Sequence, residues 1–270
     1  MKIRKVARQY YEGKKTAKAG RLILDKNNST LKLLDFRYLS LNTRKKVSEH
    51  FPKREAVLVL LKGRCSITVG GRKYLLGLRK NVFKNKSHSL YIPPNVSFTC
   101  SATSSQTEIA IVTTPASSST RKVVSISPRK VCVKKVGSDT YKRTVHTIFT
   151  KKIAGNDSHL LVGETFNAEG KWSSFPPHKH VRDNLPHETR YEEVYFFKVN
   201  PHDGFGLIRI YDEQKESVYC IRNNDCFIVT KGYHPICAAP GCCVYYMWAM
   251  TGAYPSVVNK YDAVFRHLPR

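Results

Sequence analysis

The 270-residue chain contains 41% hydrophobic and 11% aromatic residues, a composition that excludes a disordered polypeptide and allows one large core or two ordinary ones. Its first eight residues lead into no apolar signal segment, and its longest apolar runs fall well short of the about 20 residues of a membrane helix. Eight cysteines without a CxxC spacing favour reduced core thiols over a zinc or redox motif. We therefore expect a cytoplasmic protein with no membrane contact.

The formal net charge of +26 is concentrated in one half of the chain. Residues 1–150 hold 32 lysines and arginines against 7 acidic residues, whereas residues 151–270 hold 14 against 13. Such an excess suits a solvated surface, the steering of an anionic substrate, or the binding of nucleic acid or another polyanion. The sequence leaves these three interpretations open.

Short segments rich in Val, Ile, Tyr and Phe alternate with Gly and Pro, and hardly any stretch keeps a helical period. This pattern predicts an all-β fold. The expected strands are 56–61, 65–69, 88–92, 107–113, 159–166, 193–199, 206–211, 226–229 and 243–250. The pair Gly70-Gly71 is typical of a hairpin turn.

A small, polar, proline-bearing segment at 113–120 has the composition of a linker between two compact units. Each half then contains a strand meander, a hairpin and a late proline-marked turn, at Pro93-Pro94 and at Pro235. We predict two barrels of one type, comprising residues 1–120, strongly basic and without a metal site, and residues 121–270, with a metal site.

The segment Phe175-Pro176-Pro177-His178-Lys179-His180 is the strongest local signal for chemistry. Because residues i and i+2 of a strand share one face, His178 and His180 can bind one ion together. Glu193 lies on an aromatic strand and needs a partner for its charge, and His234 follows the glycine of a tight turn.

These four residues suit a divalent metal, with zinc as the first choice and iron, manganese, nickel or cobalt as alternatives. On spacing alone, the two histidines of the HxH segment fit the polar rim of a strand equally well. Glu193 could also pair with Lys179 or Arg190. We expect Glu192 to point away from the ligands, His146 to face inward, and His187 and His202 to face solvent.

The spacing of HxH, a later strand glutamate and a final histidine after a glycine turn resembles the metal motif of the cupin superfamily. A closer resemblance is to the 5-deoxy-glucuronate isomerases, bicupin enzymes of myo-inositol catabolism. It extends over most of the chain and is carried by residues 56–65, 82–83, 91–94, 163–167, 172–180, 184–188, 192–195, 204–206, 232–235, 239–241 and 245–246.

The resemblance implies two tandem cupin barrels of double-stranded β-helix (jelly-roll) type, with His178, His180, Glu193 and His234 as metal ligands in the second. It also implies conversion of 5-deoxy-D-glucuronate to 5-dehydro-2-deoxy-D-gluconate, and a chain that can form homo-oligomers. Three positions depart from the family pattern: Val181, Ile208 and Trp248 stand where Asp, Gln and Asn are usual. The substrate is therefore less firmly implied than the metal ligands.

Conversion of an aldose to a ketose by proton transfer requires an acid and a base, whereas a hydride shift requires no base. The candidate groups are Glu164, whose pKa we expect to be raised by an apolar strand, Lys179 and Tyr246. The sequence does not choose among them.

A sugar acid also requires a cation for its carboxylate, and arginine suits planar recognition better than lysine. Arg143 and Arg209 are the candidates, with Tyr211 and Tyr233 as neighbouring substrate-binding residues. Three other functions remain open: a related uronate ketol-isomerase, an iron-dependent oxygenase, and a non-catalytic bicupin that binds polyanions.

Overall fold

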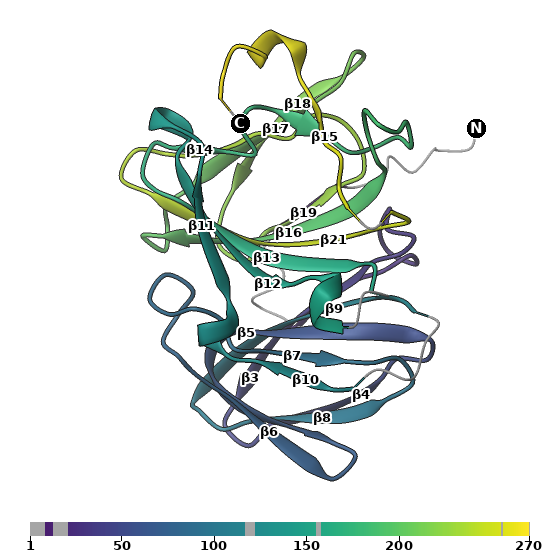
Figure 1. Cartoon of the computed structure of the whole chain (residues 1–270). Helices are drawn as coiled ribbons and strands as arrows, with labels where there is room; N and C mark the ends of the chain where they lie inside the picture. Colours follow the sequence, from purple (N-terminus) through teal and green to yellow (C-terminus); the bar gives the residue numbers. More distant parts are fainter. Residues whose placement is uncertain (1–8, 13–20, 117–121, 155–157, 255, 270) are drawn as a thin grey trace, which may run out of the picture.

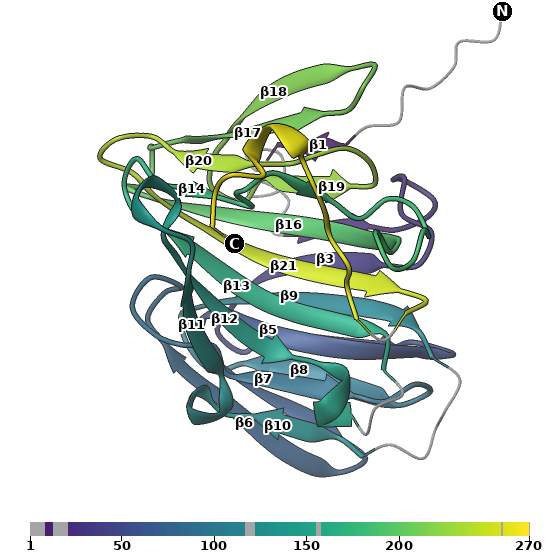
Figure 2. The ribbon, with the colours of Figure 1, turned by 45° about the horizontal axis from the view of Figure 1, so that its top comes forward.

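The computed structural model describes residues 9–12, 21–116, 122–154, 158–254 and 256–269. Strands make up most of these residues and form two stacked barrels, the first in purple and blue and the second in green and yellow (Figures 1 and 2). Four short 3-10 turns accompany them: η1 (Pro128–Lys130), η2 (Asp139–Tyr141), η3 (Lys151–Ala154) and η4 (Ala263–Phe265). The predicted all-β fold is confirmed.

The first barrel is built on one long strand that belongs to both of its layers. This strand, β5, pairs through its first half with β7 and β9 and through its second half with β6 and β8. The turn after it falls at Gly70-Gly71, as predicted. The strands are β2 (Arg21–Leu24), β3 (Asp35–Asn42), β4 (Lys46–His50), β5 (Arg54–Val69), β6 (Arg72–Arg79), β7 (Ser89–Ile92), β8 (Ser97–Ala102), β9 (Gln106–Pro115) and β10 (Val124–Ile126).

The second barrel has a seven-stranded sheet of order β1-β19-β16-β21-β13-β12-β11, faced by smaller sheets of order β14-β20-β17-β18 and β15-β22. Two of the expected strands, 206–211 and 226–229, coincide with β17 and β19. The strands are β1 (Tyr10–Tyr11), β11 (Cys132–Val136), β12 (Arg143–Phe149), β13 (Leu160–Asn167), β14 (Trp172–Ser173), β15 (His178–Lys179), β16 (Tyr191–Asn200), β17 (Gly206–Tyr211), β18 (Glu216–Ile221), β19 (Cys226–Val229), β20 (Ile236–Ala238), β21 (Cys243–Gly252) and β22 (Lys260–Tyr261).

The two barrels exchange strands, so a single cut at residue 120 does not describe them. Strand β1, near the start of the chain, pairs with β19 of the second barrel, and β10 pairs with β7 of the first. The first half of the expected linker continues β9 to Pro115, while residues 117–120 lie outside the described residues.

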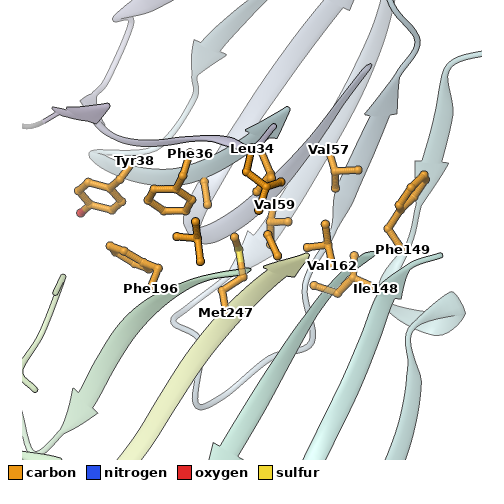
Figure 3. Close-up of a cluster of buried hydrophobic side chains, with 14 of the residues drawn as sticks. Leu34, Phe36, Tyr38, Val57, Val59, Ile148, Phe149, Val162, Phe196 and Met247 are labelled. Atoms are coloured by element: carbon orange, nitrogen blue, oxygen red, sulfur yellow. The ribbon is translucent and has the colours of Figure 1, made fainter. Parts of the chain in front are cut away.

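An apolar layer joins the barrels, because the seven-stranded sheet buries both of its faces. Phe196 of β16 packs on the first barrel with a ring-centroid distance of 4.9 Å to Tyr38 (Figure 3). Its neighbours Tyr195 and Phe197 point to the opposite face, into the second barrel. Alternation along this strand therefore separates the joint between barrels from the interior of the second barrel.

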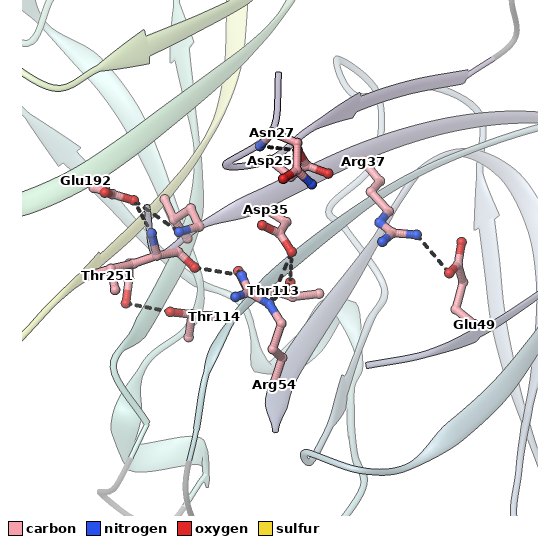
Figure 4. Close-up of polar contacts among 12 residues, drawn as sticks. Asp25, Asn27, Asp35, Arg37, Glu49, Arg54, Thr113, Thr114, Glu192 and Thr251 are labelled. Atoms are coloured by element: carbon pink, nitrogen blue, oxygen red, sulfur yellow. Dashed lines mark hydrogen bonds and ion pairs between the residues drawn. The ribbon is translucent and has the colours of Figure 1, made fainter. Parts of the chain in front are cut away.

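Polar contacts also fix the joint between the barrels. The Glu192 carboxylate accepts hydrogen bonds from the backbone N–H groups of Lys32, Leu33 and Leu34, at 2.9, 2.8 and 3.1 Å (Figure 4). Thr114 and Thr251 share a hydroxyl contact of 3.0 Å. The expectation that Glu192 points away from the expected metal ligands is therefore confirmed.

No helix in the described part of the chain has the length and apolar character needed to cross a membrane. All eight cysteines are free; Cys132 and Cys220 are exposed, while Cys237 and Cys243 are half-buried.

Candidate metal centre

Three histidines and one glutamate meet inside the second barrel. His178 and His180 lie at the start and just past the end of β15, Glu193 lies on β16, and His234 follows the turn after β19. His180 Nε2 is 3.1 Å and His234 Nε2 is 3.7 Å from the same Glu193 oxygen. The ring of His178 lies 5.0 Å from that of His234. The four residues expected to bind a metal are thus brought together.

The turn that presents His234 depends on a glycine. Gly232 has a φ of +77°, and a Cβ atom there would lie 2.6 Å from the backbone oxygen of Tyr211. Because only glycine adopts this conformation without strain and fits this space, the Gly-Tyr-His order of the turn fixes where the imidazole enters.

Backbone carbonyls orient all three imidazoles in the same way. The Nδ1 atoms of His178, His180 and His234 lie 3.2, 3.1 and 3.1 Å from the carbonyl oxygens of Pro176, Tyr191 and Gly232. Since a carbonyl can only accept, each Nδ1 carries a proton and each Nε2 faces the centre of the cluster.

The electrostatics of the cluster favour neutral imidazoles at two of the three positions. Burial lowers the pKa of His178 to about 3, with a contribution from the neighbouring His180. Burial and repulsion from the other two histidines hold the pKa of His234 well below its ordinary value. Burial alone would lower the pKa of His180 as well, but the hydrogen bond and charge of Glu193 raise it.

A divalent metal fits this cluster. One ligand atom from each of His180, Glu193 and His234 lies within 4.8 Å of the others. His234 Nε2 is buried and has no hydrogen-bond partner in the described part of the chain, a costly arrangement unless a cation accepts its lone pair. Three nitrogens and one carboxylate leave coordination positions open, as in catalytic sites.

Aromatic side chains form the floor beside these ligands. The Tyr195 ring lies 6.0 Å from that of His234 and 4.9 Å from that of Tyr246. Trp248, one of the departures from the family pattern, is paired in register with Tyr195 and shares its face. Its ring occupies the space over Gly163, where a Cβ atom would lie 2.1 Å from Trp248 Cζ2.

The other two departures are Ile208, which belongs to the same apolar core as Tyr195 and Tyr246, and Val181. Ile208 is fully buried in the core of the second barrel. The backbone N–H of Val181 donates to Glu188 at 2.6 Å, a contact that a change of its side chain leaves in place.

Arg143 lies at the edge of the centre. Its Nη1 donates to the carbonyl oxygens of Phe175 at 2.9 Å and Tyr141 at 3.2 Å. Its charge contributes to the lowered pKa of His178 and opposes the burial that raises the pKa of Tyr246. Of the two candidate arginines, this is the one beside the ligands.

Glu164 lies on the opposite face of the sheet from Glu193, which corrects the expectation made for it. Its carboxylate is fully buried at the joint between barrels, 2.7 Å from Arg79 Nη1 and 2.8 Å from the Tyr245 hydroxyl. Burial would raise its pKa, as we expected, but the Arg79 charge and hydrogen bonds lower it instead. The Glu164 carboxylate therefore cannot act as a base on a substrate held at the three histidines and Glu193.

Lys179 also points away from the cluster, because it alternates with the two histidines. Its ammonium group lies 3.0 Å from Glu213 and 4.9 Å from the centre of the Tyr233 ring. Tyr233 stacks on Tyr211 with a ring-centroid distance of 5.1 Å. We call Lys179, Glu213, Tyr233 and Tyr211 the outer cluster.

Arg209 lies on the outer face of β17, where it pairs with Glu216 at 2.7 Å and covers Tyr211 at 3.8 Å. The expected groups Lys179, Arg209, Tyr211 and Tyr233 therefore do not meet at the ligands in this structure. The remaining histidines lie as predicted, with His187 and His202 exposed and His146 directed toward Glu164 at 3.6 Å.

Comparison with known proteins identifies the family. Residues 10–267 match the model of the KduI/IolB family. The chain belongs to the KduI/IolB family. This family member is 39% identical over 203 residues to the 5-deoxy-glucuronate isomerase of Geobacillus kaustophilus, with 74% of the chain and 72% of the relative covered. It is 33% identical over 226 residues to the enzyme of the same name from Shouchella clausii, with 82% of each covered.

Solved structures agree with this placement of the KduI/IolB chain. An IolB-like protein from Salmonella typhimurium superimposes with a TM-score of 0.86 at 27% identity, covering 91% of this chain and 94% of that one. Oxalate decarboxylase from Lactobacillus farciminis shares the fold, with a TM-score of 0.66 at 8% identity and coverage of 96% and 90%. The predicted cupin fold is thus confirmed, and the relatives identify the chain as an isomerase.

Proposed function

We propose that this chain is a metal-dependent aldose–ketose isomerase that converts 5-deoxy-D-glucuronate to 5-dehydro-2-deoxy-D-gluconate in myo-inositol catabolism. The observation that carries the proposal is the buried group of His180, Glu193 and His234 with the half-buried His178 beside it. Backbone carbonyls orient the three imidazoles, and the set leaves coordination positions open. The proposed substrate is taken from the names of the relatives.

Zinc is the metal we propose, because nitrogen and carboxylate donors suit it and the reaction requires no redox change. A bound divalent ion would polarise the substrate carbonyl and hold the adjacent hydroxyl group. Isomerisation then moves one hydrogen from the hydroxyl-bearing carbon to the carbonyl carbon, while a proton moves from one oxygen to the other.

Tyr246 is the protein group that we propose for the transfer of the proton between the substrate oxygens. Burial raises its pKa, so its hydroxyl stays protonated at neutral pH and acts as a donor rather than a base. Its ring contacts Tyr195 on the floor beside His234. Glu164 and Lys179, the other candidates, point elsewhere.

A substrate panel tests the proposed activity. Purified, metal-loaded protein should convert 5-deoxy-D-glucuronate, with formation of the 5-keto product followed by NMR, and should consume no oxygen. Turnover only of another uronate would identify the related ketol-isomerase. The departure at Trp248, which pairs with Tyr195 beside the candidate ligands, would then provide a structural reason for the different substrate. Oxygen consumption with added iron would instead identify an oxygenase.

Substitution of Arg143 by lysine should raise KM and lower kcat/KM by about 10- to 100-fold, because lysine keeps the charge but cannot hold a carboxylate with two parallel hydrogen bonds. Steady-state kinetics on the same substrate measures the change. Arg209→Lys is the control, since Arg209 pairs with Glu216 on the outer face. Equal effects of the two substitutions would remove Arg143 from the proposed site.

Polyanion binding is a second candidate function. Residues 56–138 contain 14 lysines and arginines and one acidic residue, Glu108, which is buried. Lys134 and Lys135 are exposed on β11. We expect a single-stranded RNA to bind in fluorescence anisotropy, with an affinity that falls about 300-fold between 50 and 200 mM salt if about six phosphates are contacted. Lys134→Glu/Lys135→Glu should weaken it, and a salt-independent affinity would contradict this function.

A further inference from the structure

The C-terminal segment, residues 256–269, returns across the second barrel (Figures 1 and 2). Its strand β22 pairs antiparallel with β15, which carries His178. The register places Tyr261 opposite His178, and their ring centroids are 5.7 Å apart. We call residues 256–269 the C-terminal strap.

Specific contacts hold the strap in this place. The backbone N–H of Asp262 donates to the carbonyl oxygen of Pro177 at 2.9 Å, and its carboxylate accepts a hydrogen bond from the Tyr211 hydroxyl. Phe265 packs edge-on against Phe175, with 5.0 Å between the ring centroids. The outer cluster around Tyr211 therefore anchors the strap.

The start of the strap is fixed as well. The backbone N–H of Thr189 donates to the Val258 carbonyl at 3.0 Å, and the Thr189 hydroxyl accepts from the Val258 N–H at 2.8 Å. The start of the strand pairing is thus tied to Thr189, after the HxH motif, and its end is tied to Pro177, before the motif. These contacts leave little freedom for the residues between them.

Side-chain alternation gives the strap one face toward the metal centre. Tyr261 lies opposite His178, and Asn259, two residues before it, falls on the same side of the strap by alternation. Lys260, between them, faces away and is exposed. The amide oxygen of Asn259 is buried without a hydrogen-bond partner among the described residues.

A buried amide oxygen without a donor is unfavourable, and a hydroxyl group of a ligand would satisfy it. A phenol and an amide beside a set of open metal positions match the many hydroxyl groups of a sugar acid. We propose that the C-terminal strap closes the metal centre and that Tyr261 and Asn259 bind hydroxyl groups of the sugar-acid substrate. The choice of ligand rests on the proposed function.

The variants Tyr261→Phe and Asn259→Ala test the ligand contacts, with Lys260→Ala as the control. Each of the first two should keep its metal, measured by elemental analysis, and lose about tenfold in kcat/KM, the effect of one hydrogen bond. The affinity for D-gluconate, a sugar acid without a carbonyl to isomerise, should fall similarly in calorimetry, and Lys260→Ala should match wild type. Wild-type kcat/KM and gluconate affinity in both variants would overturn the assignment.

A second measurement requires neither metal nor turnover. Diethyl pyrocarbonate should modify His178 and His234 in the metal-free Asp262→Ala/Phe265→Ala variant about tenfold faster than in wild type, because the anchors of the strap are removed. The exposed His187 should react equally in both proteins and serves as the internal control. If each of the three histidines reacts at the same rate in the variant as in the wild type, the proposed closure is wrong. A wild-type protein without isomerase activity would contradict the proposed function alone, since these rates would still decide the role of the strap.

Discussion

Replacing His234 with alanine should remove the bound metal and the isomerase activity together. His234 Nε2 is buried, has no hydrogen-bond partner among the described residues and lies 3.7 Å from Glu193. Loss of a ligand and of the several kcal/mol that a metal contributes to the reaction should lower kcat/KM by about a thousandfold or more. Elemental analysis and steady-state kinetics on the same preparation measure both effects.

The matched control is His202→Ala, whose side chain is 84% exposed on a loop of the same barrel. It should keep full metal content and activity. Circular dichroism should show the same β content for both variants, since the change at His234 removes a ligand and not an element of the core. A His234→Ala protein that retains stoichiometric metal would contradict the ligand set.

Replacing Arg79 with methionine should destabilise the protein by about 3–5 kcal/mol, because it leaves the buried Glu164 carboxylate without its cation. Arg79 belongs to the first barrel and Glu164 to the second, and both side chains are at most 1% exposed. Urea unfolding of the two proteins measures the difference. Arg209→Met, which breaks an exposed pair, should cost less than about 1 kcal/mol.

The pH dependence of this difference has a definite sign. The folded-state pKa of Glu164 is lowered, so its ion pair stabilises the wild type above the ordinary carboxyl pKa, and this contribution is lost as the pH falls through the folded-state value. In Arg79→Met, burial raises the pKa of Glu164, and acidification instead relieves the buried charge. The gap between the two proteins should therefore shrink from pH 7 to pH 4. A constant gap would show that the charge of Glu164 is not the cause.

Local patterns were sufficient to predict that the four candidate ligands lie close together, because each of them depends on its near neighbours. His178 and His180 are two residues apart, and Glu193 shares a face with Tyr195. The same rule was sufficient to place Arg209 as well: Ile208 and Ile210 are buried, so the residue between them faces outward. That apolar pair was the signal that our prediction for Arg209 did not use.

Other features could not be predicted from local patterns. Strand β13 is buried on both faces, because the second barrel packs on the first, so its apolar sequence does not show which way Glu164 points. The pairing of His178 with Tyr261 joins strands about eighty residues apart, and neither strand has more than two residues. Such contacts depend on the complete fold and not on periodicity.

The exchange of strands between the barrels also determines how the protein would respond to being divided. Strand β1 completes the second barrel and β10 completes the first, although each lies on the other side of the β9–β10 connection in the chain. A backbone break in that connection would therefore give two fragments that each hold a strand of the other's sheet. Such fragments should remain associated as a complementing pair, and neither should serve alone as a minimal single-barrel enzyme.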